Sequence, residues 1–263
     1  MKKIIFILLF LFTLGGCTKT ESALEDIKAK GKLIVATSAD FPPFEYLEGD
    51  EYLGFDIELV KAFAEYLKVE IEIKDQDFDG ALLSVSSGKA HLAIAGITVN
   101  EKRLESMSFS KGYFQASQVI IVKEGSLING TTIEEVEASL TSHKAKIGVQ
   151  RGTVAEYYVE GDEDWEFPGI PNTTCTVYDS GALAVVALNQ GKVDAVMIDE
   201  APARKFVEKN PGLKVINVLL TEEEYAIAVH RGDNKMVAKL NEFIDAFKAS
   251  GEFTSLLNKY FGN

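Results

Sequence analysis

The chain has 263 residues, of which 46% are hydrophobic, enough for one large domain or two moderate ones with a packed core. Its formal net charge is -13, from 40 acidic and 27 basic residues. Such a chain would repel a polyanion, and no basic stripe stands out, so we expect no nucleic-acid partner. The acidity favours solubility and attraction of cations, and it does not bear on the fold.

The N-terminus resembles the signal of a bacterial lipoprotein. A short basic start precedes an almost unbroken apolar run, Ile4 to Leu14, which is too short to span a bilayer permanently. Small residues then precede Cys17, as in the lipobox, where the cysteine receives a diacylglyceryl group and a fatty acyl chain such as palmitate. We expect residues 1–16 to be cleaved and residues 17–23 to form a tether. An ordinary secretory signal with an incidental cysteine is the alternative. Losing the two lysines of the signal leaves 25 basic and 40 acidic residues, a mature net charge of -15.

The rest of the chain has one more cysteine, Cys175. A lone cysteine cannot form an intramolecular disulfide, so the core must hold the fold. We expect Cys175 to behave as a buried small apolar residue rather than as a catalytic thiol.

The first half of the chain alternates strand and helix patterns. Strands are predicted at residues 33–37, 69–73 and 91–95. A 3.6-residue apolar period after Gly54 predicts one helix, and residues 79–87 predict a second that stops at Gly88. This β-α-β-α-β order argues for a mainly parallel sheet covered by helices.

A second alternating set follows. Strands are predicted at 119–122, 146–150, 174–178 and 193–198, and helices near 132–140, from 153, at 180–190 and from 201. After the segment 213–220 come an apolar strand, 225–229, and two amphipathic helices, 234–249 and 253–260. Two α/β sets with one helical tail predict two lobes, and periodicity alone does not assign the tail to either.

Four clusters of polar and aromatic residues lie where predicted strands end, the position at which open α/β sheets bind ligands. They are Thr37–Phe44, Asp77–Gly80, Gly96–Thr98 with Arg103, and Gln150–Thr153 with Asp199. An arginine suits a carboxylate, a helix start suits an anion and an aspartate suits a cation. Together they fit the head group of a free α-amino acid. Alternatively, Arg103 pairs with a neighbouring glutamate and Asp199 caps the next helix.

These motifs resemble those of the extracellular solute-binding proteins of family 3, the polar amino-acid-binding lipoproteins of ABC importers. Gly54–Leu59 is similar to the family signature, although Phe63 stands where a smaller residue is usual. The matching run also contains, in family order, Phe41–Glu45, Asp77–Gly80, Ala95–Thr98 with Arg103, Gln150–Thr153 and Asp194–Asp199. The resemblance covers the mature chain from about residue 24 to residue 261.

The resemblance implies an α/β, two-lobed periplasmic-binding-protein fold of type II. Two crossing strands, near 117–122 and 220–225, would form the hinge. Lobe 1 would be discontinuous, residues 24–118 and 222–263, and lobe 2 would be residues 119–221. The implied partners are a polar L-amino acid, the permease of an ABC importer and, through lipid on Cys17, the membrane. We expect a monomer without a cofactor, anchored outside the plasma membrane or in the periplasm.

The family's binding residues map onto ten positions of this sequence. Arg103 would bind the α-carboxylate with backbone N–H groups of Thr98 and Val154, and the Gly96 carbonyl, the Thr98 hydroxyl and Asp199 would hold the α-ammonium. The other positions, around the ligand or its side chain, are Ser38, Phe41, Phe78, Gln150 and Thr153.

The position of Ser38 bears on specificity. Family members that bind glutamine or basic amino acids often carry an aspartate there. With serine, the pocket would offer hydrogen bonds and aromatic faces but no certain counter-charge. We therefore expect neutral polar ligands such as glutamine to bind at least as well as arginine or lysine.

Two other functions stay open. Relatives with this fold dehydrate cyclic acids, which would require a cleft acid or base with a perturbed pKa beyond the head-group clamp. Related domains also serve as sensory ectodomains. The sequence has no G-x-S-x-G elbow, P-loop or G-x-G-x-x-G motif, and its three histidines lack metal-ligand spacing. We expect a binding protein rather than an enzyme, and no metal site.

Overall fold

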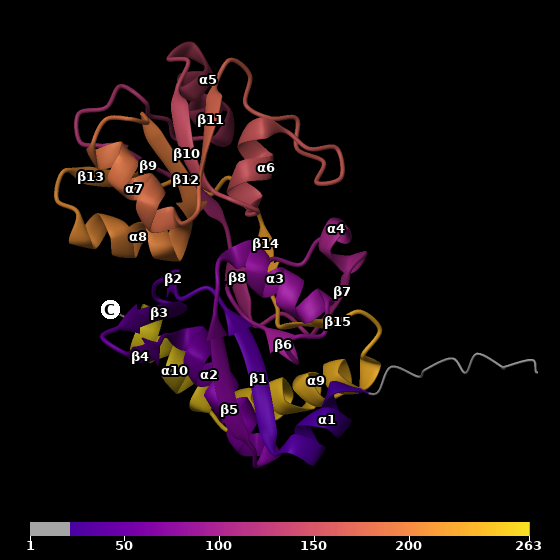
Figure 1. Ribbon diagram of the computed structural model, residues 1–263. Helices are drawn as coiled ribbons and strands as arrows, with labels where there is room; N and C mark the ends of the chain where they lie inside the picture. Colours follow the sequence, from indigo (N-terminus) through magenta and orange to yellow (C-terminus); the bar gives the residue numbers. More distant parts are fainter. Residues whose placement is uncertain (1–21, 263) are drawn as a thin grey trace, which may run out of the picture.

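A computed structural model describes residues 22–262 and arranges them in two α/β lobes, each built on a five-stranded sheet (Figure 1). The first sheet has the order β5 (Glu70–Asp75), β1 (Lys32–Thr37), β6 (Leu92–Ala93), β15 (Ala228–His230) and β7 (Met107–Phe109). The second has the order β11 (Thr174–Tyr178), β10 (Lys146–Gln150), β12 (Ala195–Asp199), β9 (Gln118–Lys123) and β13 (Leu213–Ile216). The predicted signal peptide and Cys17 lie outside the described residues.

Both sheets are mixed rather than mainly parallel. β1 is parallel to β5 and β6, and β10 is parallel to β11 and β12. β15 and β9 instead run antiparallel to the strands on both of their sides. Each is the first strand of its sheet after the chain crosses from the other lobe. Such a strand runs away from the crossing, whereas β1, β6, β10 and β12 end near it.

The hinge is a two-stranded antiparallel ribbon of β8 (Phe114–Ala116) and β14 (Glu223–Tyr225). The predicted single strand at 225–229 is therefore wrong. Its first residue belongs to β14 in the hinge, and its last two residues belong to β15 in the first sheet. An apolar run alone does not reveal that the chain changes sheets within it.

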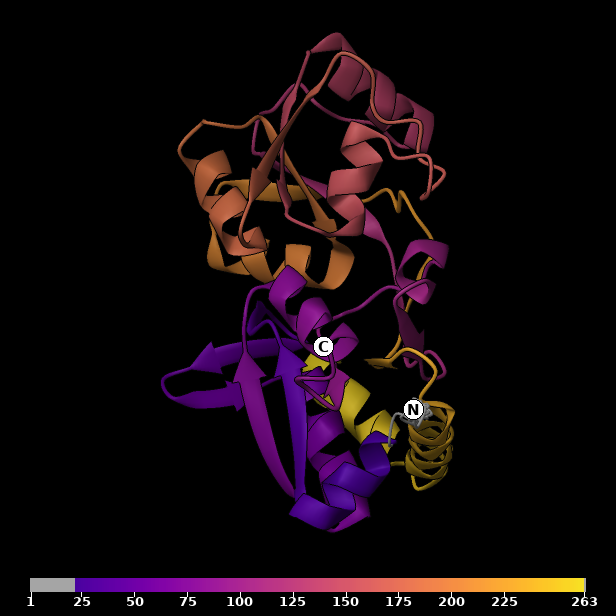
Figure 2. The same ribbon diagram turned by 45° about the vertical axis from the view of Figure 1, so that its right-hand side comes forward.

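Helices cover both sheets. In the first lobe they are α1 (Ala23–Lys30), α2 (Phe55–Leu67), α3 (Phe78–Ser86) and α4 (Glu101–Leu104), joined by α9 (Asn234–Ala249) and α10 (Glu252–Phe261). In the second they are α5 (Ile133–Ser142), α6 (Val154–Glu160), α7 (Gly181–Asn189) and α8 (Glu200–Lys209). Both C-terminal helices pack on α2, and Figure 2 shows them beside the indigo and purple elements of the first lobe. None of the helices within residues 22–262 is both long and apolar enough to cross a membrane.

The start of α2 shows why the Gly54 motif has its sequence. Gly54 has φ +124°, and a Cβ there would lie 2.1 Å from the carbonyl oxygen of Phe44. The glycine therefore lets α2 begin directly against the chain before β3 (Glu45–Glu48), which pairs with β2 (Asp40–Phe41) and β4 (Glu51–Leu53) in a small antiparallel sheet. This sheet, absent from the sequence prediction, holds Asp40 and Phe41 beside the cleft.

An aromatic cluster lies beneath the hinge. Phe44 is fully buried and contacts Tyr225 of β14, Phe114 of β8 and Phe261 of α10, with ring centroids 4.8–5.2 Å apart. Phe55, the first residue of α2, joins the same cluster. The C-terminal helix is thus packed against the strands that connect the lobes.

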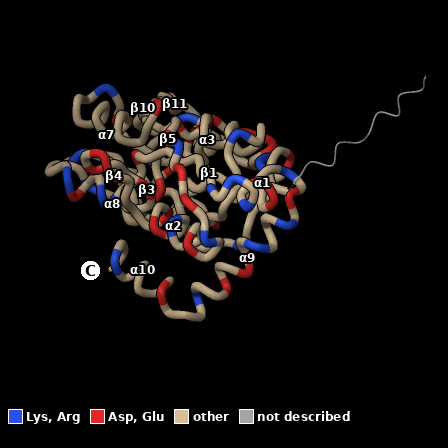
Figure 3. Tube along the Cα trace, turned by 60° about the horizontal axis from the view of Figure 1, so that its bottom comes forward, with Lys and Arg blue, Asp and Glu red and all other residues tan. Residues whose placement is uncertain are grey.

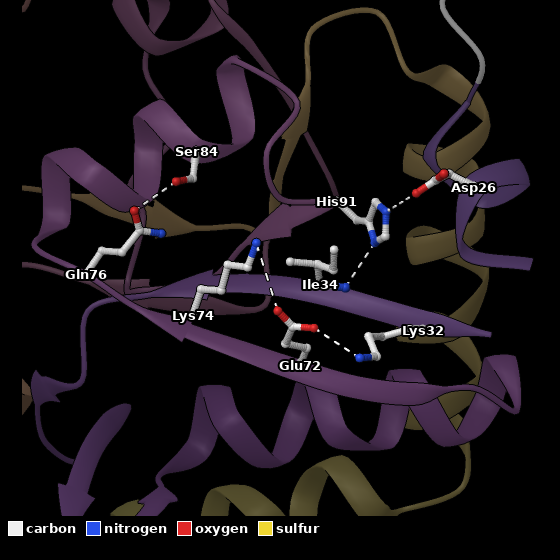
Figure 4. Close-up of polar contacts among 8 residues, drawn as sticks. All are labelled: Asp26, Lys32, Ile34, Glu72, Lys74, Gln76, Ser84 and His91. Carbon is white, nitrogen blue, oxygen red and sulfur yellow. Dashed lines mark hydrogen bonds and ion pairs between the residues drawn. The ribbon is translucent and has the colours of Figure 1, made fainter. Parts of the chain in front are cut away.

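The N-terminal helix α1 is tied to the first sheet through a buried histidine (Figure 4). The Nδ1 atom of His91 accepts a hydrogen bond of 2.9 Å from the backbone N–H of Ile34, so Nε2 carries the ring proton and donates it to Asp26 at 2.8 Å. Ser22 caps α1 and donates to Asp233, and Ala23 begins the helix. These last two residues of the expected tether are therefore placed in the fold. Both ring nitrogens of His91 are thus hydrogen-bonded within the fold, which makes it a structural residue.

Charged residues of both signs are spread over the surface. Figure 3 shows Lys and Arg interspersed with Asp and Glu along α9 and α10 rather than gathered on one face. Cys175 in β11 is half-buried against the core of the second lobe. Burial raises the pKa of its thiol to about 12, so the thiol stays protonated at neutral pH.

Candidate functional site

A small cavity lies between the lobes, at the carboxyl ends of β1, β10 and β12. All ten positions proposed from the sequence line it, and four further residues do as well. The lining consists of Ser38, Asp40, Phe41, Glu45, Phe78, Ala95, Gly96, Thr98, Arg103, Gln118, Gln150, Thr153, Val154 and Asp199. The fold brings the ten together from both lobes, and their roles in binding remain predictions.

Arg103 lies at the meeting point of the two lobes. Its backbone N–H is capped by Asn100, its Nη1 donates to the Thr98 carbonyl at 2.7 Å, and its Nη2 donates to the Gly152 carbonyl at 3.1 Å in the other lobe. It is only 5% exposed and forms no ion pair with any carboxylate among the described residues. Burial lowers its pKa to about 10, so the guanidinium is charged at neutral pH. It therefore keeps N–H groups and a positive charge for an anionic partner.

Asp199 supplies the opposite charge from the second lobe. It occupies the N-cap position of α8, yet its side chain makes no capping hydrogen bond. Instead its Oδ1 accepts a hydrogen bond of 2.5 Å from the hydroxyl of Tyr225 in the hinge. Burial, aided by the negative charge of Glu223, raises the pKa of Asp199 to about 7. The hydrogen bond goes to the hinge and not to the start of α8, so Asp199 is not acting as a helix cap. Its position in the cavity lining instead suits a carboxylate that binds a cation.

Glu223 is a buried hinge carboxylate that the sequence analysis missed. It accepts hydrogen bonds from Thr98 Oγ1 at 2.6 Å, from Thr221 Oγ1 at 2.6 Å and from Gln118 Nε2 at 3.0 Å. Because the Thr98 hydroxyl donates its proton to Glu223, its oxygen lone pairs are free to accept from an ammonium in the cavity. A pattern of three consecutive glutamates before Tyr225 gave no signal that the second would be buried.

The turn after β10 contributes backbone groups from the second lobe. Gly152 has φ +73°, and a Cβ there would lie 2.0 Å from Asp79 Oδ1 across the cleft. Thr153 is the N-cap of α6, and its hydroxyl donates to the Gln150 carbonyl at 2.8 Å rather than to the helix. The N–H of Val154 lies in the first helical turn, where backbone donors have no intrahelical partner. Gln150 accepts from the Gly181 N–H at 3.1 Å, which leaves its amide N–H groups for other partners.

The cavity lining also contains a carboxylate that the sequence analysis did not foresee. Ser38 donates to Asp40 Oδ1 at 3.3 Å, and both line the cavity with Phe41. Burial raises the pKa of Asp40 against the opposing effect of the Ser38 hydrogen bond. No Lys or Arg among residues 22–262 forms an ion pair with it. The expectation of a side-chain pocket without a counter-charge did not take Asp40 into account, and it stays a prediction.

A pair of buried carboxyl groups lies under the cavity. Asp56 Oδ2 accepts from the Gly96 N–H at 3.0 Å and from the Tyr113 hydroxyl at 2.7 Å. Glu45 is fully buried, and no donor among the described residues satisfies its oxygens. Burial and then the charge of Asp56 raise the pKa of Glu45 well above its usual range, while burial raises the pKa of Asp56 to about 6. The pair therefore favours a proton on Glu45 and the negative charge on Asp56.

Comparison with known proteins identifies the family of the chain. The family model of the bacterial extracellular solute-binding proteins, family 3, matches residues 33–263. A probable histidine-binding protein of Neisseria gonorrhoeae is 32% identical over 86% of this chain and 82% of its own length. The arginine-binding extracellular protein ArtP of Bacillus subtilis is 31% identical over 99% of this chain and 98% of its own.

Solved structures share the fold. The substrate-binding protein AbpA of an amino acid ABC transporter from Streptococcus pneumoniae, bound to L-arginine, has a TM-score of 0.79 and 33% identity, covering 90% of this chain and 97% of its own. The ancestral amino-acid-binding protein AncCDT-1, a precursor of cyclohexadienyl dehydratase, has a TM-score of 0.81 and 28% identity, covering 91% and 100%. These neighbours are two-lobed periplasmic binding proteins of type II, which confirms the predicted fold class. The chain belongs to the bacterial extracellular solute-binding proteins of family 3.

Proposed function

We propose that the protein is the substrate-binding component of an ABC importer and that it binds a polar L-amino acid with a cationic side chain, such as arginine. One observation carries the proposal. Arg103 from the first lobe and Asp199 from the second line the same interlobe cavity, as the counter-charges of an α-carboxylate and an α-ammonium. A zwitterion that contacts both would bind the closed form more tightly than the open form, which gives closure a physical cause.

The preference for a cationic side chain rests on Asp40. A partly buried carboxylate that lacks a positive partner is unfavourable, and a guanidinium or ammonium would relieve that cost. The aromatic faces of Phe41 and Phe78 beside the cavity would add cation–π attraction. The relatives named for arginine and histidine fit this class of ligand. The earlier expectation that glutamine would bind at least as well as arginine is replaced by this proposal.

The proposal includes an extracytoplasmic location, which agrees with the family, and a lipid anchor at Cys17. The lobe limits, residues 24–118 with 222–263 and residues 119–221, belong to it as well, supported by the sheet to which each strand belongs. Mass spectrometry of the mature chain would test the anchor: we expect acyl chains on Cys17 and loss of membrane attachment in Cys17→Ala. An unmodified Cys17 on a processed chain would contradict it.

A catalytic role is the second candidate, and one observation favours it. Glu45 lines the cavity, is fully buried and has a strongly raised pKa, which are the properties required of a general acid. The named relatives are binding proteins, so we propose that this chain binds without turnover. Incubation with prephenate or arogenate, followed by detection of the dehydrated aromatic product, would decide between the two. Product formation that Glu45→Gln abolishes would favour the enzyme.

Isothermal titration calorimetry of the non-lipidated mature chain tests the main proposal. We expect L-arginine to bind, and to bind at least about tenfold more tightly than L-glutamine. A thermal-shift screen of the twenty amino acids would run in parallel, because a tight ligand raises the melting temperature by mass action. Tight glutamine binding with weak arginine binding would refute the role of Asp40. No response to any amino acid would refute the proposal as a whole.

A further inference from the structure

The 162–167 hairpin of the second lobe reaches across to the arginine of the first. Asp162 and Phe167 form an antiparallel bridge that closes this hairpin. The Asp162 carboxylate accepts hydrogen bonds from the backbone N–H groups of Asp164 and Trp165 at 2.9 and 3.1 Å, and these bonds fix the conformation of the hairpin tip. The hairpin therefore has a defined conformation and presents Trp165 from a fixed base.

Trp165 lies against the guanidinium of Arg103. The Arg103 Cζ atom is 5.2 Å from the centre of the Trp165 ring and equally 5.2 Å from that of Phe78 in the first lobe. Trp165 also stacks on Tyr157 of α6, with ring centroids 4.6 Å apart and planes 20° apart. The four groups Phe78, Arg103, Trp165 and Tyr157 thus form one stack, with its first two members from lobe 1 and its last two from lobe 2.

We propose that Trp165 is a positioning residue for the ligand carboxylate: it closes over Arg103 when the lobes meet and fixes the guanidinium against Phe78. The inference rests on the proposed function, since it assigns Arg103 to an α-carboxylate. A guanidinium held between two rings has lost most of its rotational freedom, so fewer conformations are lost when the carboxylate binds. Opening the lobes separates Trp165 from Arg103, which ties the arrangement of the grip to closure.

The exposed ion pair between Lys102 and Asp164 bridges the same two elements, and it is the obvious competing explanation. Both side chains are about half exposed, and such pairs contribute little. If the hairpin acted only through this pair, Asp164→Asn would weaken binding more than a change at Trp165. Phe167→Leu is a second comparison, because Phe167 belongs to the same hairpin and packs on Tyr158 and on the edge of the stack at Trp165, with ring centroids 5.0 and 6.3 Å apart, but does not itself lie over the Arg103 guanidinium.

The chain has a single tryptophan, so intrinsic tryptophan emission reports this position alone. In the unmodified protein we expect saturating L-arginine to change Trp165 emission in step with the calorimetric isotherm. In calorimetry, Trp165→Leu should raise the Kd for L-arginine about three- to thirtyfold, the range of a desolvated cation–π contact. Trp165→Phe should retain most of the affinity, and Asp164→Asn and Phe167→Leu should change it less than threefold.

Two results would overturn the inference while leaving the proposed function intact. One is arginine binding by calorimetry with unchanged Trp165 emission. The other is a Trp165→Leu protein with the same melting curve and the same Kd as the unmodified chain. If no amino acid binds the unmodified chain, the proposed function fails first and the inference fails with it. The emission experiment needs no substitution, so it decides the matter even if Trp165→Leu does not fold.

Discussion

In the proposed assignment, Arg103 and Asp199 at the head-group end come from different lobes, whereas Ser38, Asp40 and Phe41 at the side-chain end all come from one short segment of the first lobe. The head-group end is therefore complete only in the closed protein. The side-chain end is largely assembled before closure. This difference separates two tasks: the head-group end can couple binding to movement of the lobes, and the side-chain end can set the preferred ligand without disturbing that coupling.

The largest effect is expected from removing the shared head-group contact. Arg103→Ala should cost about 2–5 kcal/mol of binding free energy for every amino acid, because it deletes a buried charge-assisted pair. Calorimetry with arginine and glutamine would measure this, with a melting curve to establish folding. Arg151→Ala removes an exposed arginine near the same turn and serves as the control. Near-normal affinity in a folded Arg103→Ala protein would remove Arg103 from the site.

Asp40→Asn should weaken the binding of cationic side chains and leave the head-group contacts unchanged. We expect it to weaken arginine by about 1.5–3 kcal/mol, the range for hydrogen bonds to charged groups, and to leave glutamine nearly unchanged. Asp50→Asn, in the exposed turn after β3, removes the same charge away from the cavity. An equal loss for both ligands would show that the side-chain end is not independent of the head-group end. Ser38→Asp should add little affinity for arginine, since the Asp40 carboxylate already lines the cavity.

A change of pH should weaken the head-group end through Asp199. Its pKa is raised to about 7 in the ligand-free cavity, and only the ionised carboxylate attracts an ammonium. Affinity should therefore be constant at high pH and fall as pH decreases through 7, by about tenfold between pH 8 and pH 6. Calorimetry in buffers of different ionisation enthalpy would also detect proton release on binding. A pH-independent Kd over this range would contradict the assignment.

The smallest effect concerns stability rather than binding. The pKa of Glu45 is raised on folding, so the folded protein binds more protons than the unfolded chain above pH 4.5. Its contribution to the free energy of unfolding therefore decreases as pH rises from that value toward the folded pKa. Glu45→Gln should remove this loss and stabilise the ligand-free protein by about 1–3 kcal/mol at pH 8 and by less at pH 5.5.

Urea unfolding of the unmodified and Glu45→Gln proteins at pH 8 and at pH 5.5 would measure this difference in the free energy of unfolding. Glu48→Gln, on the exposed end of the same strand, is the matched control and should leave the pH dependence unchanged. If Glu45→Gln instead lowers stability at pH 8, the prediction fails: Glu45 would then be ionised in the folded protein, with a cation or hydrogen-bond donor that compensates its charge.

The residues of the cavity also differ in how far the sequence could predict them. The head-group residues follow predicted strands closely, and β10 and β11 have the bounds read from their apolar patterns. The place of Asp40 in the cavity could not be predicted, because the family's binding position is Ser38 and the two-residue strand β2 has no period to detect. The burial of Glu223 could not be predicted for another reason. It depends on hydrogen bonds from Thr98 and Gln118, which are more than 100 positions away in the sequence. Local patterns identify strand ends, and they do not identify which distant side chains meet there.

The direct contacts of the hinge ribbon have a mechanical consequence. Thr98 and Asp199 are hydrogen-bonded to Glu223 and Tyr225, both in β14, so the head-group end lies beside the axis on which the lobes turn. Rotation about an axis displaces atoms in proportion to their distance from it. These two contacts with β14 therefore shift least, whereas the Arg103 hydrogen bond to Gly152 of the other lobe breaks, and β2 and α7, which are in contact across the lobes, separate most. Under the proposed function, the cleft opens widest between β2 and α7, and an amino-acid head group that enters there passes along the cleft to reach Arg103 and Asp199.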